Sequence, residues 1–119
     1  VVQIFSTRFA FAAVKVVGGV VTWGDAERGG DSSAVQEELR DGVVQIFSTS
    51  FAFAALKEGG KVVTWGEAEC GGDSSAVQEE LRDGVVQIFS TRFAFAAVKV
   101  VGGVVTWGDA ERGGDSSAV

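Results

Sequence analysis

Several residue types that build common active sites are missing or rare. The 119-residue sequence has no histidine, tyrosine, methionine or proline, and a single cysteine, Cys70. Without histidine, the commonest general base and the commonest neutral metal ligand are absent, and no serine can join a Ser–His nucleophile pair. Gly29-Gly30 is not followed by Gly-Lys-Ser/Thr, which excludes a phosphate loop of that type. We therefore expect no enzyme activity and no cofactor.

Other absences limit the compartment and the partners. One cysteine cannot make an internal disulfide, so the fold does not depend on an oxidising compartment. The longest strictly apolar run covers residues 9–14, far too short for a transmembrane segment. The net charge is −6 and the basic residues are scattered singly. Because a surface of that sign repels phosphate backbones, we expect no nucleic acid as a partner.

What the sequence does contain is a near-identical repeat. The segment VVQIFST recurs every 42 residues, and residues 1–35 are identical to residues 85–119. We predict three units, repeat 1 (1–42), repeat 2 (43–84) and repeat 3 (85–119), the last without the linker of the other two. Units that meet similar neighbours form a ring or a solenoid. Since the chain begins at Val1 without a methionine, we interpret it as part of a longer array.

Each unit is predicted to contain three strands. Residues 1–6 are rich in β-branched and aromatic side chains, as are residues 20–23, which is typical of strands. Residues 9–14 alternate Phe and Ala with no polar face, so we expect this strand to be covered on both sides. Gly18-Gly19, and Gly59-Gly60 in the middle unit, indicate a turn between strands. The unit therefore reads as a β-meander.

A polar loop and a short linker follow the third strand. We expect a helical linker of little more than two turns, with Ser33 and Gln36 as a capping box and Gly42 at its end. Val35 and Leu39 give it one apolar stripe. The glycine-rich loop before it has room for a short fourth strand. The predicted unit thus has three to four strands and a helical linker.

This pattern resembles the RCC1-like (regulator of chromosome condensation) repeat, as in tandem arrays of dinoflagellate proteins. The residues that match are Ala13-Val14 (Ala55-Leu56 in the middle unit), Gly18, Val20-Val21-Thr22-Trp23-Gly24 and Gly29. The sequence departs from the family where Thr7 and Ala10 stand in place of a glycine and a histidine. The family's Gly-Gln-Leu-Gly loop is replaced by residues 29–32, and its usual unit has no helical linker.

The resemblance implies a mainly β fold of propeller-like blades. Members of the family form a ring of about seven four-stranded blades, within the usual range for propellers. Three units do not close such a ring, so the outermost blades would expose apolar sheet faces, and such faces mark interfaces. We expect the chain to self-associate, to sit in a longer array or to dock on a larger complex. An open stack of β-meander repeats is the alternative architecture.

Acidic residues crowd the glycine-rich loop of every unit, and we predict them as interaction residues. Oxygen-rich loops of this kind can hold Ca²⁺, but Gly29 and Gln36 occupy positions where an EF-hand loop needs ligands. We therefore expect no metal, and we expect Asp31 to cap the turn before the linker. The predicted interaction residues are Asp25, Glu27, Asp31, Glu67, Glu69, Asp73, Asp109, Glu111 and Asp115.

The large aromatic residues are predicted to form the structural core. One tryptophan stands at the same position in every unit, as expected for an anchor between blades. The predicted core residues are Trp23, Trp65, Trp107, Phe9, Phe11, Phe51, Phe53, Phe93 and Phe95. Cys70 occupies the position of Arg28 in the first unit. Because it exchanges with arginine, we expect an exposed thiol without a role.

The sequence therefore predicts a non-catalytic repeat scaffold that mediates protein–protein interaction or self-association. The alternative is a small structural subunit docked on a larger complex, with a membrane complex as one form of it. The mean hydropathy of +0.25 favours this alternative.

Overall fold

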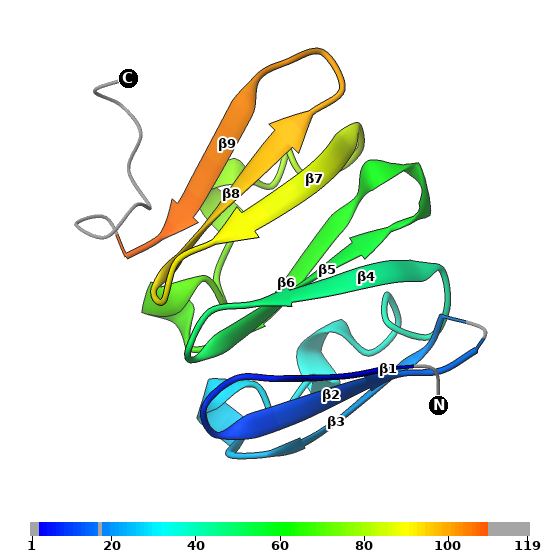
Figure 1. Cartoon of the computed structure of the whole chain (residues 1–119), viewed down its shortest axis with the longest axis vertical. Helices are drawn as coiled ribbons and strands as arrows, with labels where there is room; N and C mark the ends of the chain where they lie inside the picture. Colours follow the sequence, from blue (N-terminus) through cyan, green and yellow to red (C-terminus); the bar gives the residue numbers. More distant parts are fainter. Residues whose placement is uncertain (1–2, 17, 110–119) are drawn as a thin grey trace.

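The computed structural model describes residues 3–16 and 18–109, which form three separate antiparallel sheets (Figure 1). Each sheet has three strands in sequence order and comes from one of the three predicted units. The strands are β1 (Gln3–Ser6), β2 (Ala10–Val14) and β3 (Val20–Gly24) in the first sheet, β4 (Val43–Ser48), β5 (Ala52–Lys57) and β6 (Val62–Gly66) in the second, and β7 (Val85–Ser90), β8 (Ala94–Lys99) and β9 (Val104–Gly108) in the third. The predicted β-meander is confirmed.

The register is the same in all three sheets. Phe11 pairs with Trp23 across β2 and β3, and Phe53 and Phe95 pair with Trp65 and Trp107 in the same way. The β2–β3 turn is closed by Gly18, whose φ is +86°, as the glycine pair predicts. A Cβ on Gly18 would lie 2.8 Å from the backbone nitrogen of Gly42 and 2.9 Å from that of Val43, the first residue of the next unit. Glycine is therefore required there both for the turn and for the close approach of the next unit.

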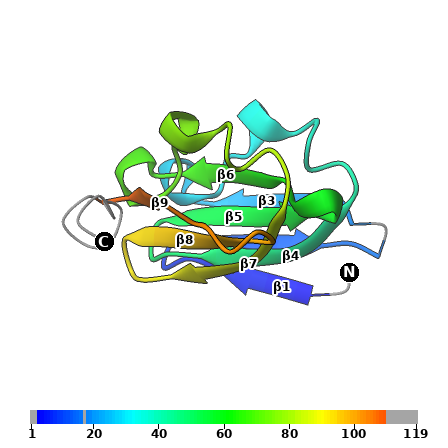
Figure 2. The same cartoon turned by 90° about the horizontal axis from the view of Figure 1, so that it is seen from above.

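The three sheets lie side by side and do not close into a ring. Figure 2 shows β1, β4 and β7 along one edge of the assembly and the short helical segments gathered along the other. Backbone hydrogen bonds join successive units at the tips of their first hairpins, where Arg8 N donates to Ser50 O and Ser50 N donates to Arg92 O. The sheets are thus held in the arrangement of consecutive propeller blades.

Each sheet has two apolar faces. We call the face that points toward the preceding unit the leading face, and the face that points toward the following unit the trailing face. The leading face of the first sheet carries Ile4, Phe11, Ala13, Val21 and Trp23. The trailing face carries Phe5, Ala10, Ala12, Val14 and Val20. The trailing face of each sheet packs against the leading face of the next, which forms one buried cluster between the first two sheets and a second between the last two. The core therefore lies between blades.

The linker differs from its prediction. A 3-10 turn, η2 (Ser33–Val35), replaces the expected helix in the first unit, and η5 (Ser75–Val77) replaces it in the second. The Ser33–Gln36 capping box is wrong, because Asp31 accepts the hydrogen bond from Ser33 N at 2.9 Å. The apolar stripe is confirmed, since Leu39 is buried in the cluster that Val35 also contacts. Packing of these two side chains, and not helix length, fixes the linker.

No fourth strand is present in any sheet over residues 3–16 and 18–109. The glycine-rich loop instead forms a 3-10 turn, η1 (Ala26–Arg28) in the first unit and η4 (Ala68–Cys70) in the second. Thr22 Oγ1 lies 2.8 Å from Ser32 Oγ and donates to Gly30 O, so the loop folds back onto β3. The blades are therefore three-stranded in the described part of the chain.

Candidate interaction surfaces

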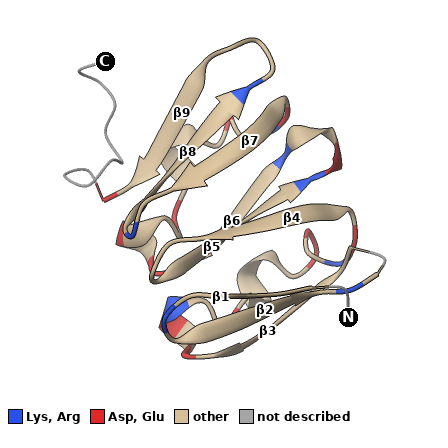
Figure 3. Cartoon of the chain, viewed as in Figure 1, with Lys and Arg blue, Asp and Glu red and all other residues tan. Residues whose placement is uncertain are grey.

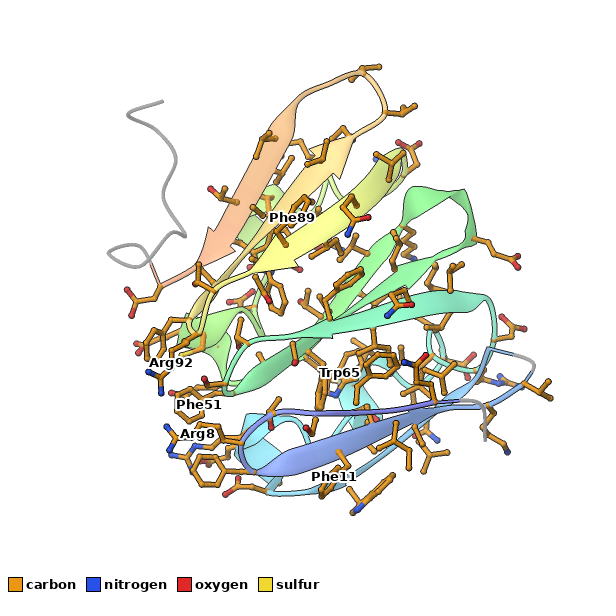
Figure 4. The ribbon with its side chains drawn as sticks, in the orientation of Figure 1. Arg8, Phe11, Phe51, Trp65, Phe89 and Arg92 are labelled. Atoms are coloured by element: carbon orange, nitrogen blue, oxygen red, sulfur yellow. The ribbon has the colours of Figure 1, made fainter. Side chains whose placement is uncertain are left out.

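The tryptophans of the second and third sheets anchor the contacts between blades. Trp65 Nε1 donates to Gly29 O of the preceding unit at 3.1 Å, and Trp107 Nε1 donates to Gly71 O at 3.2 Å. Each indole ring also stacks on the phenylalanine opposite it in the sheet, Phe53 or Phe95. Trp65 therefore lies between the first two sheets with its ring packed and its N–H group hydrogen-bonded (Figure 4).

The leading face of the first sheet is uncovered. Trp23 is 44% exposed, whereas Trp65 at the equivalent position is 4% exposed. Phe11 stacks on Trp23 at a centroid distance of 5.4 Å and is also exposed. Ile4 and Val21 extend the same surface. Phe11 and Trp23, predicted as core, therefore lie on an open apolar face, because no sheet of the described residues packs against it.

The trailing face of the third sheet is open in the same way. Phe89 and Val104 are both more than half exposed, while their equivalents in the second unit, Phe47 and Val62, pack into the second cluster. A hollow of about 100 Å³ lies beside Phe89 and is lined by Ala94 and Ala96. The stack thus ends in an open apolar face on each side, and the two faces are of different composition.

Phe9, Phe51 and Phe93 do not belong to the interblade core. They precede β2, β5 and β8 and stack in a row, with centroid distances of 5.8 Å between Phe9 and Phe51 and 6.1 Å between Phe51 and Phe93. None of the three is buried, and Phe9 is exposed. The sequence placed these residues in a strand and in the core, and both assignments need correction. Each ring follows a Thr-Arg or Thr-Ser hairpin tip, so it lies at the rim of the blades.

Arginine side chains cover this row of rings. The guanidinium of Arg28 lies 5.0 Å from the centroid of Phe9 and 5.7 Å from that of Phe51, within the range of cation–π attraction. Arg28 also pairs with Asp25 at 3.3 Å and lies 3.6 Å from a carboxylate oxygen of Glu67 in the next unit. Figure 4 shows Arg8, Phe51 and Arg92 together at this end of the sheets. Sequence reasoning missed this rim, although the Arg-Phe pairs at 8–9 and 92–93 were visible.

The predicted acidic residues do not form one site. Charged residues gather at strand ends and in the loops (Figure 3). Asp25 accepts a hydrogen bond from Glu27 N and caps η1, and Glu67 faces Arg28. Glu27 and Glu69 are exposed. Asp109 follows β9, and Glu111 and Asp115 lie outside the described residues. Within residues 3–16 and 18–109, no three acidic or cysteine side chains cluster as metal ligands would.

Asp31 and Asp73 act as local caps. Hydrogen bonds from Ser33, from its hydroxyl and then from its backbone N–H, lower the pKa of Asp31, and Ser75 lowers the pKa of Asp73 in the same way. The expected cap at Asp31 is confirmed by the 2.9 Å bond from Ser33 N. These carboxylates are therefore occupied in holding the loop.

Cys70 lies inside the structure, contrary to its prediction. It ends η4, and its carbonyl accepts a hydrogen bond from Thr49 Oγ1 at 2.8 Å. Arg28 at the equivalent position extends past the loop to reach carboxylates at the surface. A long arginine can carry its charge out of a partly buried position, whereas a short thiol stays within it. Exchange with arginine therefore did not indicate exposure.

In the part of the chain that the structure describes, no helix is long and apolar enough to span a membrane.

No protein-family model and no curated protein matches the sequence. Solved structures do match its fold. Human WBSCR16 superposes with a TM-score of 0.62 at 20% identity, over 93% of this chain and 35% of that protein. Prp20p from Saccharomyces cerevisiae gives 0.61 at 20% identity, over 90% and 30%. Yeast RCC1 (Prp20), solved with Kap60 bound, gives 0.60 at 20% identity, over 90% and 29%.

This chain therefore spans about a third of the length of the solved structures it matches. The likeness concerns the arrangement of blades, because an identity of 20% accompanies near-complete coverage of the chain. The interblade packing and the match to yeast RCC1 lead to the same result. The chain has the fold of RCC1-like β-propeller repeats, and its three sheets are arranged as consecutive blades of a partial propeller.

Proposed function

We propose that the chain is a non-catalytic repeat scaffold that mediates protein–protein interaction. One observation carries the proposal: the apolar faces that are buried between blades are uncovered at both ends of the stack. Large contiguous apolar patches on a protein surface mark interaction sites. Trp23 and Phe11 stack on each other on the open face. Aromatic residues are enriched in protein interfaces, and tryptophan is among the residues that contribute most binding energy there.

The rim of the blades would add selectivity to this binding. Arg8, Arg28 and Arg92 lie beside the row of phenylalanines, while Glu27 and Glu69 project from the loops. Charges at the edge of an interface select partners and change association rates more than they change affinity. Prp20p is described by its binding to Gsp1p and histones, and yeast RCC1 by its complex with Kap60. A shared fold supports a protein partner for this chain by analogy only.

A second candidate function is a small structural subunit that docks on a larger complex. The mean hydropathy of +0.25 and the two uncovered faces favour it, because a host surface would bury both. This candidate predicts that the chain needs its host to stay in solution, whereas the scaffold stays soluble by itself.

Multi-angle light scattering on the purified chain over a dilution series distinguishes these outcomes. A scaffold gives discrete soluble assemblies that dissociate on dilution, and a docked subunit precipitates without its host. A soluble monomer that binds no dye specific for exposed apolar surface at any concentration would contradict the proposed function. A soluble monomer that does bind the dye would be consistent with the scaffold function and would indicate that the partner is a different protein.

A further inference from the structure

The two ends of the stack carry opposite halves of an interface that the chain already makes twice. The first sheet presents an open leading face, and the third sheet presents an open trailing face. Between them, a trailing face meets a leading face at both internal contacts. The missing neighbour of the first sheet is thus a trailing face, and that of the third sheet is a leading face.

The side chains of these faces are repeated almost without change. Every leading-face residue is the same in the three units: isoleucine, phenylalanine, alanine, valine and tryptophan, at Ile4, Phe11, Ala13, Val21 and Trp23 and their equivalents. The trailing face of the third sheet has the same residues as that of the first, because residues 85–119 repeat residues 1–35. The trailing face at the end of the stack is therefore chemically the one that the second sheet already accepts.

Burial at equivalent positions shows what each open face lacks. Val21 on the open leading face is 51% exposed, but Val63 at the same position in the second sheet is 4% exposed. Val104 on the open trailing face is 58% exposed, but Val62 is 6% exposed. The residue is valine in each case, and the member that a neighbouring blade covers is the buried one.

From this complementarity we infer that the partner of the open faces is a second copy of this chain, bound head to tail. The leading face of one copy receives the trailing face of the next, with the sheet-to-sheet packing of the two internal interfaces. The linker residues Leu39 and Leu81, which are buried in those interfaces, have no equivalent in residues 85–119. The inference rests on the proposed function and names its partner. Because the two surfaces in such a contact differ, each added copy leaves one face of each kind open, and the assembly grows until it closes into a ring or continues as a filament.

A symmetric contact between two leading faces would lose the hydrogen bond that both internal interfaces make. Trp65 and Trp107 donate to a glycine carbonyl in the loop of the preceding unit. A leading face that meets its own copy brings tryptophan against tryptophan and offers no such carbonyl. In the sequence of the third unit, Gly113 stands at the position of Gly29 and Gly71. A head-to-tail contact keeps the pairing of faces in which Trp65 and Trp107 find their acceptors.

A pair of charge substitutions tests the direction of binding. Val21→Asp blocks the leading face and keeps the trailing face, whereas Val104→Asp does the reverse. Both positions are exposed in the isolated chain, so the folded blades tolerate them. Each variant alone is expected to be a monomer near 12.3 kDa. An equimolar mixture is expected to form a single heterodimer of twice that mass, measured by sedimentation velocity, because one intact face of each kind remains.

Val86→Asp is the matched control. Val86 is exposed in the third sheet, and its equivalent Val44 stays exposed although the second sheet is covered on both faces. This variant should associate as the unaltered chain does. Far-UV circular dichroism and the urea midpoint show whether each variant is folded, and Val21→Lys with Val104→Lys provides a second pair.

The inference is overturned if Val104→Asp alone still dimerises, because its intact leading faces would then bind each other. It is equally overturned if the mixture of folded variants stays monomeric. One outcome separates the two proposals: the unaltered chain associates, each variant alone is monomeric, and the mixture forms no heterodimer. This outcome would contradict the head-to-tail arrangement but not the proposed function. A monomer without an apolar surface detectable by dye would remove the proposed function as well.

Discussion

The first and second sheets carry the same leading-face residues, yet their surroundings are opposite. Phe53 is fully buried, whereas Phe11 is 45% exposed, and the tryptophans that stack on them differ in the same way. Neither strand propensity nor hydrophobic pattern separates them, since the local sequence is shared. The comparison shows that burial in this fold is set by the neighbouring blade, as in other repeat proteins whose stability is a sum of unit and interface terms.

Replacing the equivalent phenylalanines by alanine should give the largest difference in unfolding free energy between the two sheets. Phe53→Ala removes a fully buried ring from the first interblade cluster and should lower the free energy of unfolding by about 3–5 kcal/mol. Phe11→Ala should cost about 1 kcal/mol or less, because its ring is half exposed in the isolated chain. Urea unfolding in dilute solution measures both. Equal losses of unfolding free energy would contradict the view that the neighbouring blade determines how much each phenylalanine stabilises the fold.

The glycine beneath Phe53 provides the next test. Gly29 has φ +115°, and a Cβ there would lie 2.6 Å from Cε2 of the Phe53 ring. Gly29→Ala should cost about 2–4 kcal/mol, from the left-handed backbone together with overpacking. Gly59→Ala is the control, because Gly59 has φ +87° with nothing within 4 Å. It should show only the backbone cost, about 1–2 kcal/mol. A similar loss in both variants would mean that the ring moves aside freely.

The indole hydrogen bond should contribute less than the ring itself. Trp65→Phe keeps an aromatic ring but leaves the carbonyl of Gly29 without its 3.1 Å donor. An unpaired buried acceptor costs about 1–3 kcal/mol. Trp23→Phe, on the open face, should change the unfolding free energy by less than about 0.5 kcal/mol. The difference between the two urea midpoints is the measured quantity, and its absence would show that water replaces the indole.

The smallest expected effect is the acid sensitivity of the loop caps. Serine hydrogen bonds lower the pKa of Asp31 and Asp73 in the folded chain. The resulting stabilisation is present above the ordinary aspartate pKa of about 3.9 and is lost as the pH falls through the lowered folded value. The urea midpoint of the unaltered chain should therefore fall as the pH is lowered from 5 to below the ordinary aspartate pKa. In the double variant Asp31→Asn, Asp73→Asn this fall should be smaller. Asp83→Asn controls for charge, and the same reduction in that variant would exclude the caps as the cause.

The sequence predicted the fold well because the repeat constrains it. The three-strand meander, the turn at Gly18, the apolar stripe of Val35 and Leu39 and the cap at Asp31 all follow from local patterns, and all are present. The likeness to RCC1-type blades was also confirmed. These features depend on residues within one unit or on its repetition.

The surface features were harder to predict because they depend on neighbours. Phe9 lies at a hairpin tip beside Arg28, not in the core, and Cys70 is buried while the arginine at its equivalent position reaches the surface. The linker has a 3-10 turn at Ser33–Val35 and a leucine, Leu39, buried between the sheets, whereas its sequence suggested a longer helix. Periodicity within one unit contains no information about which side chain from the next unit will be adjacent.

Within residues 3–16 and 18–109, the hydrogen bonds between blades join adjacent units. Trp65 reaches back 36 residues to Gly29, and Trp107 spans the same separation to Gly71. Adding a blade therefore never requires a contact between distant parts of the chain. Since the entropic cost of loop closure sets folding speed, each new blade should fold onto the last at a rate that does not fall with the length of the array.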